Sequence, residues 1–224
     1  MWVEVANSVD SERNRSVDET PLPPAVGEAF GQLYGTDAPA TVGEWIETMR
    51  AAIEDERGRA PTVADLCATD DGDHAFVGAE REQTYICVLD PLVYPYLTGE
   101  RGTVRSTTPV RGAEVTFEVG DHGVAVSHQD AVVSIGVSTD PEGVDGVPVE
   151  TVYREVCGYI QTFEDRAEYE TWAEEVDAAT TAVPAAVGVE IVWALAETLF
   201  DGNVSVADRG EATEAVCTPE SDCC

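Results

Sequence analysis

The chain has 224 residues, of which 44 are acidic and 12 are basic, so its formal net charge at pH 7 is -32. All 12 basic residues are arginine. Self-repulsion of this size opposes compaction in dilute buffer, but in about 1 M salt the Debye length falls to about 3 Å and screens it. We therefore expect a halophilic protein from a salt-accumulating, haloarchaeal cytosol. The charge excludes nucleic acid and anionic membrane surfaces as partners, since both require a basic patch.

The N-terminal sequence, MWVEVANSVDSERNRSVDE, lacks the basic start and apolar run of a signal peptide. The most apolar later stretch, residues 182–200, is broken by Pro184, Gly188 and two glutamates, which argues against a membrane span. We therefore expect a soluble, cytoplasmic protein. In a reducing cytosol its six cysteines are expected to be free thiols, metal ligands or catalytic groups rather than disulfides.

The N-terminal part of the chain is predicted to be a polar segment followed by helices. Residues 1–21 are expected to be disordered, and residues 22–78 to form a small helical module. Its strongest helix is TVGEWIETMRAAIEDERG, where Thr41 and Glu44 form a capping box and Gly58 ends the helix.

Strand patterns follow in the runs QTYI, GTVRST, AEVTFEVG, GVAVSH and AVVSIGVS, with a hairpin turn at 120–123. A loop is expected at 139–148, and two helices come later, one beginning after Asp165 and one over 185–200. The order of helices, antiparallel strands and helices predicts an α+β fold. The core is expected to span residues 79–206, ahead of a flexible tail at 207–224.

The segment YICVLDPLVYPYLTG contains a cysteine, Cys87, three positions before Asp90. On a strand the two side chains would point to opposite faces, whereas at a helix start they would share a face. We favour the helix start, where amide donors would also stabilise a thiolate. Pro91 suits a first helical turn, and Pro95 is expected to kink or end the helix. A structural alternative makes Cys87 a small buried hydrophobe and Asp90 a capping acid.

A second cysteine lies in a similar apolar segment, VYREVCGYIQTF, which contains Cys157. Taken in order, YICVLDPLVYPYLTGERGTVRSTTPVRGAEVTFEVG, VYREVCGYIQTF and the aromatic segment YETWA resemble the alkylmercury lyases, or organomercurial lyases. The resemblance runs from about residue 80 to residue 200. Enzymes of that family break carbon–mercury bonds with two cysteines and an aspartate.

The resemblance implies that Cys87 and Cys157 are catalytic, mercury-binding thiols and that Asp90 handles the proton. Hg(II) is a soft cation that prefers thiolate ligands. A nearby carboxylic acid could then protonate the carbon as it leaves. Organomercury would be the substrate, and Hg(II) would remain as the bound product before it passes to small thiols or to a mercuric reductase.

The sequence departs from the family at three places. Gly158 follows Cys157 where known members often have another cysteine, and STTPV replaces a further cysteine in the sheet region. The family's N-terminal region resembles a winged helix, which residues 22–68 match only loosely. We expect a degenerate module that packs against the core rather than one that reads DNA.

The C-terminal residues CTPESDCC contain Cys217, Cys223 and Cys224. The adjacent pair resembles the paired C-terminal cysteines of mercuric reductases, which predicts a relay that carries Hg(II) away. The structural alternative is a mobile end with incidental cysteines.

The remaining candidates are weaker. Cys67 and His74 flank an acidic stretch, but one cysteine and one histidine fall short of a zinc site, so a charged surface turn is expected there. We find no nucleotide-binding motif and expect no cofactor. The functional alternative to a lyase is a non-enzymatic protein on the same fold that binds soft metals or responds to thiols.

Overall fold

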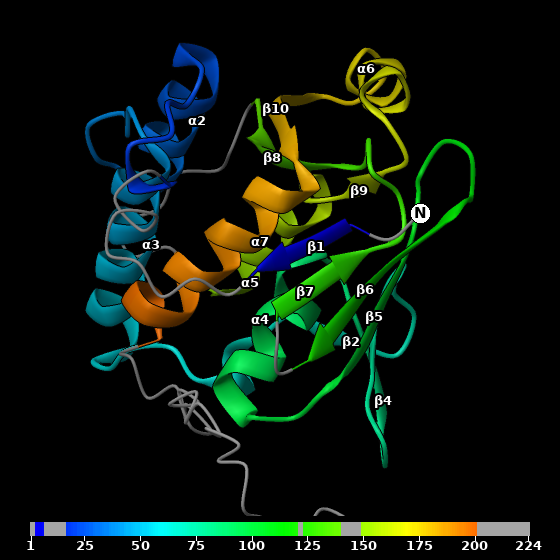
Figure 1. The fold of residues 1–224 in the computed structure, drawn as a ribbon. Helices are drawn as coiled ribbons and strands as arrows, with labels where there is room; N and C mark the ends of the chain where they lie inside the picture. Colours follow the sequence, from blue (N-terminus) through cyan, green and yellow to red (C-terminus); the bar gives the residue numbers. More distant parts are fainter. Residues whose placement is uncertain (1–2, 7–16, 121–122, 140–148, 201–224) are drawn as a thin grey trace, which may run out of the picture.

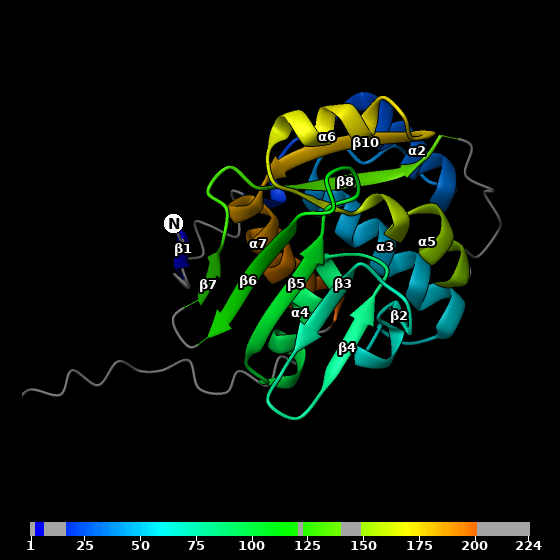
Figure 2. The same cartoon turned by 90° about the vertical axis from the view of Figure 1, so that its right-hand side faces the viewer.

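The computed structural model describes residues 3–6, 17–120, 123–139 and 149–200. The expected tail, most of the expected loop at 139–148 and the tip of the expected hairpin turn lie outside these ranges. The described residues form an α+β fold with two antiparallel sheets, as predicted (Figures 1 and 2).

The helices alternate with strands along the chain. They are α2 (Pro24–Tyr34), α3 (Val42–Arg57), α4 (Leu89–Thr98), α5 (Val149–Glu155), α6 (Arg166–Ala173) and α7 (Ala185–Ala194). Shorter turns are the 3-10 turns η1 (Val63–Asp65) and η2 (Cys157–Tyr159) and the π-helical turn η3 (Leu195–Leu199).

The larger sheet has seven strands. In spatial order they are β1 (Val3–Ala6), β7 (Gly123–Val126), β6 (Glu114–Gly120), β5 (Gly102–Thr107), β3 (His74–Val77), β4 (Glu82–Tyr85) and β2 (Ala68–Thr69). The smaller sheet has the order β10 (Ala178–Pro184), β8 (Val132–Ser138) and β9 (Thr162–Phe163).

The helix predicted after Thr41 is confirmed as α3. The Thr41 hydroxyl accepts the backbone N–H of Glu44 at 3.2 Å, and the Glu44 carboxylate accepts the N–H of Ala40 at 2.6 Å. The first bond satisfies a donor that the first helical turn leaves free, and the second holds the residue before the cap, so Glu44 does not close the predicted capping box onto Thr41. Gly58 ends the helix in a left-handed conformation at φ 66°, which costs glycine little. The helix buries Trp45 and four aliphatic or thioether side chains on one face.

The predicted strands of the larger sheet are also confirmed. Along β6, Val115, Phe117 and Val119 are buried and alternate with more exposed residues, so one face of the sheet is apolar. Helix α4 packs on the sheet through β3, β4, β5 and β6. Helix α7 and η3 contact α4 on one side and α3 on the other (Figure 2). The space between the sheet and α3 is therefore the apolar core of the protein.

Five strands were not predicted from the sequence, namely β1, β2, β3, β9 and β10. Val3–Ala6 was expected to be disordered, but it pairs with β7 as the edge strand of the larger sheet. The acidic stretch before His74 is an exposed turn, as expected, but the residues that follow it form β3, which lies between β5 and β4. Strand β10 leads directly into α7, the helix predicted from residue 185. Strands β2 and β3 thus place part of residues 22–78 in the same sheet as the later strands.

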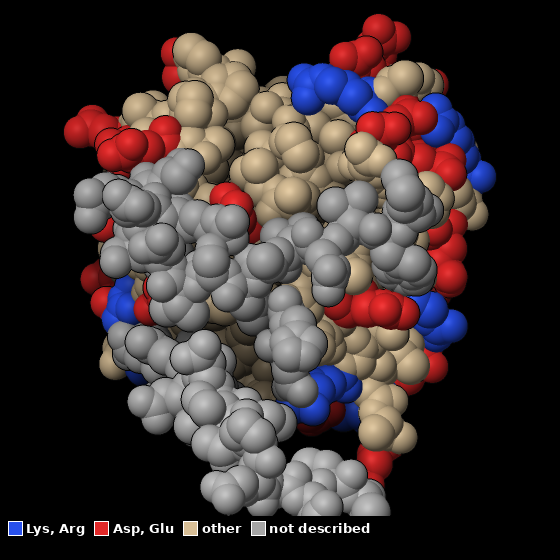
Figure 3. Space-filling view, viewed as in Figure 1, with Lys and Arg blue, Asp and Glu red and all other residues tan. Residues whose placement is uncertain are grey.

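Acidic side chains are spread over the face seen in Figure 3, with fewer arginines between them. This distribution matches the composition of the chain. Within the described ranges, no helix combines the length and the hydropathy needed to cross a bilayer.

Candidate functional site

Three buried cysteines meet at the junctions between helices and strands. Cys67 follows η1 and precedes β2, Cys87 lies between β4 and α4, and Cys157 is the first residue of η2. Their exposed fractions are 1%, 2% and 7%, and all three are free thiols. The three Sγ atoms lie within 4.8 Å of one another, and those of Cys67 and Cys87 are 3.7 Å apart. Three soft donors are therefore within reach of a single metal ion.

Backbone hydrogen bonds hold the three segments together. The N–H of Cys67 donates to the Asp90 carboxylate at 2.6 Å, and the N–H of Ile86 donates to the Cys67 carbonyl at 3.1 Å. The N–H of Val88 donates to the carbonyl of Ile160, three residues after Cys157, at 3.2 Å. The thiols are thus fixed by the main chain of three segments that are far apart in sequence.

The helix start predicted at Cys87 and Asp90 is confirmed. Val88 caps α4, which places Asp90 in its first turn beside Pro91. The expectation that Pro95 would end the helix is wrong, because α4 continues to Thr98. It ends at Gly99, which has φ 75° and donates its N–H to the carbonyl of Pro95.

The three thiols differ in pKa. Hydrogen bonds from Cys157 and Cys87 lower the pKa of Cys67 far below its usual range. Burial raises the pKa of Cys87, and the hydrogen bond to Cys67 raises the pKa of Cys157. Cys67 is therefore the thiol of the three that gives up its proton most readily. The expected preference for a Cys87 thiolate at the helix start is not favoured, because burial raises the pKa of Cys87.

Asp90 lines the same pocket as Cys87 and Cys157. Its removal from water raises its pKa well above the usual value, and the charge on Cys67 raises it further. Asp90 therefore holds a proton more readily than an exposed aspartate does. A carboxyl group of this kind can act as a proton donor to a group bound at the thiols.

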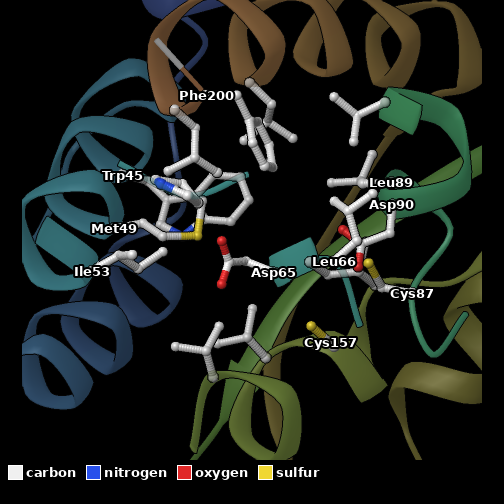
Figure 4. Close-up of a pocket in the computed structure, with 17 residues that line it drawn as sticks. Trp45, Met49, Ile53, Asp65, Leu66, Cys87, Leu89, Asp90, Cys157 and Phe200 are labelled. Carbon is white, nitrogen blue, oxygen red and sulfur yellow. The ribbon is translucent and has the colours of Figure 1, made fainter. Parts of the chain in front are cut away.

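An apolar pocket opens onto these groups (Figure 4). Figure 4 shows Trp45, Met49 and Ile53 of α3 on one wall and Cys87 and Asp90 across from them. The other apolar lining residues are Pro61, Leu66, Leu89, Val93, Val152, Val156, Ile160, Leu195, Leu199 and Phe200. A pocket with this lining accommodates an alkyl or aryl group and excludes water from the thiols.

Asp65 is the other carboxylate of the pocket. Its side chain is 4% exposed and pairs with Arg57 and Arg59, and it accepts the N–H and hydroxyl of Thr62 at 2.7 and 2.9 Å. Hydrogen bonds from Arg59 lower the pKa of Asp65 to about 2. Asp65 is thus an ionised acid that fixes η1, the turn that leads into Cys67.

The structure brings Cys87, Asp90 and Cys157 together, and it adds Cys67, which sequence analysis had assigned to a surface turn. The turn at residues 70–73 has exposed aspartates, as expected, but Cys67 and His74 at its two ends are buried. Cys67 belongs to the thiol cluster, and His74 is fully buried between Ser106 and Gln161, with ring nitrogens 2.7 and 3.0 Å from their side-chain oxygens. Cys217, Cys223 and Cys224 lie outside the described residues.

A cluster of buried thiols beside a carboxyl group with a raised pKa and an apolar pocket defines a protein that handles a soft metal ion carrying an organic group. The family model of the alkylmercury lyases matches residues 68–201, which is more than half of the chain. The chain therefore belongs to the alkylmercury lyase family. Its activity is cleavage of the carbon–mercury bond of alkyl- or arylmercury by protonation of the carbon, and its substrate is organomercury.

The other comparisons add little. No curated protein matches the chain. Among solved structures, the mercury-bound form of MerB2 aligns with 84% of this chain and 97% of its own, at 13% sequence identity and a TM-score of 0.46.

Proposed function

We propose that Cys87 and Cys157 bind the mercury of the substrate and that Asp90 delivers the proton to its carbon. The observation that carries this assignment is the shared pocket, because all three residues line the same apolar cavity. The organic group occupies the apolar part of the pocket. The mercury faces the sulfur atoms, which lie within 4.8 Å of each other.

The reaction balances without a redox step. One cysteine thiol displaces the small thiolate carried by the substrate, which leaves as a thiol. The second cysteine thiol gives up its proton and binds mercury through sulfur. Asp90 gives its own proton to the carbon as the carbon–mercury bond breaks and takes up the proton of the second cysteine, which yields the hydrocarbon and Hg(II) bound to two sulfurs. Asp90 ends as it began, so it acts as a proton shuttle.

The dry pocket contributes to the rate in two ways. It keeps Asp90 protonated at neutral pH, and it keeps water and chloride from competing with the cysteines for mercury. Chloride competition matters here, because we propose that the enzyme works in a salt-rich, haloarchaeal cytoplasm. The excess of acidic residues supports that setting.

We further propose that Hg(II) leaves to small thiols or to a mercuric reductase, with Cys217, Cys223 and Cys224 as a relay. The cysteine-rich end of the sequence supports the relay. It is tested by replacing the three cysteines with serine and measuring transfer of Hg(II) to a reductase. Unchanged transfer would contradict the relay.

The residue assignment is tested by benzene release from phenylmercury in molar KCl with excess small thiol. Multiple turnovers are expected from the intact enzyme. In Asp90→Asn the rate should fall by about 10²- to 10⁴-fold, the usual contribution of general acid catalysis. Asp130→Asn replaces an exposed carboxylate and is the matched control.

Cys87→Ser and Cys157→Ser should each abolish turnover, with circular dichroism used to verify folding. Stoichiometric mercury binding without benzene release by the intact protein would instead indicate a non-enzymatic soft-metal binder. Full turnover by Cys157→Ser would contradict the two-thiol assignment and leave the lyase activity in place.

A further inference from the structure

We propose that Cys67 is a third mercury-binding thiol, so that the Hg(II) product is held by Cys67, Cys87 and Cys157 as a trigonal trithiolate. The proposal rests on the proposed function, because it takes Hg(II) on Cys87 and Cys157 as the product of the reaction. It adds a ligand that the reaction itself does not require.

The spacing of the sulfurs fits three-fold coordination, and Cys67 and Cys87 are too close together for a linear unit. A metal–thiolate bond is about 2.3 Å for zinc and longer for the larger mercury ion, so a linear S–Hg–S unit needs sulfurs at least about 4.6 Å apart. Three-fold coordination with the same bond needs about 4.0 Å. The Sγ atoms of Cys67 and Cys87 are 3.7 Å apart, and no pair of the three exceeds 4.8 Å. An ion at the centre of such a triangle would lie within about 2.8 Å of each sulfur.

The main chain holds Cys67 in this position. Its N–H is bound by the Asp90 carboxylate and its carbonyl by the N–H of Ile86, so it is tied on both sides to the segment that carries Cys87. Asp65 with its two arginines fixes the preceding turn. A thiol positioned by this many contacts loses little further conformational freedom when it binds an ion.

Cys67 also differs from the other two thiols in its relation to the pocket. Cys87 and Cys157 line the cavity, whereas Cys67 is absent from its lining and is only 1% exposed. The substrate therefore meets Cys87 and Cys157 first, with its organic group in the cavity. Cys67 coordinates the mercury from the side that faces away from the cavity, and therefore away from the organic group.

The complete reaction balances with three thiols. Organomercury bound to one small thiolate reacts with three cysteine thiols and gives the hydrocarbon, the free small thiol, one proton and an anionic mercury trithiolate. Mercury remains Hg(II) and no sulfur is oxidised. The proton released to solvent is that of Cys67, the most acidic of the three thiols, and the balance is the same whether this proton leaves before or during mercury binding.

The test uses the full-length chain with Cys217, Cys223 and Cys224 replaced by serine, so that the only cysteines left are the three of the site. The protein is loaded with one equivalent of HgCl₂ and studied by X-ray absorption at a mercury edge. We expect three sulfur neighbours, and two at shorter distance when Cys67→Ser is added. The small-thiol concentration that removes half of the mercury should fall at least about tenfold in Cys67→Ser, since even loss of an outer-shell partner can weaken metal sites by that factor.

Two sulfur neighbours in the parent protein would overturn the proposal and leave Cys67 as a buried packing residue. This measurement requires no substitution at Cys67, so it holds even if that variant fails to fold. Benzene release is measured on the same protein preparations before HgCl₂ is added. If the protein releases benzene and its mercury has two sulfur neighbours, only the proposed third thiol is refuted. If mercury has three sulfur neighbours but no benzene is released, the proposed function is refuted and a trithiolate site remains.

Discussion

Protonation of His74 should destabilise the protein as the pH falls. His74 lies in β3, where its Nδ1 is 2.7 Å from the Ser106 hydroxyl and its Nε2 is 3.0 Å from the side-chain oxygen of Gln161. Gln161 in turn donates to the carbonyl of Gly158, at 3.1 Å, in the turn that contains Cys157. A neutral ring that donates from Nε2 and accepts at Nδ1 satisfies both contacts. A charged ring would lack solvation in this buried position.

The magnitude follows from the pKa of the buried ring. Burial lowers the pKa of His74 to about 4 from its usual 6.5. Below about pH 6.5 His74 is protonated in the unfolded chain but not in the folded chain, so the free energy of unfolding decreases as the pH falls from about 6.5 towards 4. Each pKa unit corresponds to about 1.4 kcal/mol, so the loss between pH 7 and pH 4 is about 3 kcal/mol.

Urea denaturation of the native chain and of His74→Gln in molar KCl measures this effect. The substitution itself lowers the free energy of unfolding at pH 7. The difference in this free energy between the native chain and His74→Gln should shrink by about 3 kcal/mol when both are taken to about pH 4. The carboxylates are common to both proteins and largely cancel in the comparison. A difference that does not change with pH would refute the buried neutral imidazole.

Three other predictions address the helix cap, the pocket and the salt dependence. Thr41→Ala removes the cap of α3 and should lower the free energy of unfolding, measured by urea denaturation, by about 1 kcal/mol. Thr48→Ala in the same helix should lower it by less, and equal losses would contradict the capping role. Val93→Phe narrows the pocket and should lower kcat/KM for phenylmercury at least about tenfold more than kcat/KM for methylmercury. An equal loss for both substrates would show that the aryl group binds elsewhere. The unfolding free energy should rise with KCl up to about 1 M, because screening weakens the repulsion within a chain of net charge -32; a flat dependence would exclude self-repulsion as a major term.

Local patterns predicted much of the fold. The cap at Thr41, the stop at Gly58 and the alternation along β6 depend on neighbours within a few residues, and each is confirmed. The same holds for the helix start at Cys87, since the choice between strand and helix was decided by nearby residues. The prediction that Cys157 lies near Cys87 also depended on the family resemblance.

Cys67 and His74 could not be identified in this way. Both lie within three residues of an aspartate, and an acidic stretch in a highly acidic chain predicts a surface position. Their burial depends on residues far along the chain, namely Asp90 for Cys67 and Ser106 and Gln161 for His74. The one available signal was the immediate return to apolar residues in AFV after His74, which is a short strand pattern.

The three-segment construction of the thiol cluster also has a consequence for biosynthesis. Cys67 and Cys87 are 20 residues apart, but Cys157 comes much later, after all seven strands of the larger sheet. Contacts between distant segments form late in folding, because loop closure must precede them. A nascent chain therefore contains two thiols of the cluster before the third is synthesised. Hg(II) present during folding is expected to bind this incomplete cluster and to lower the yield of folded protein.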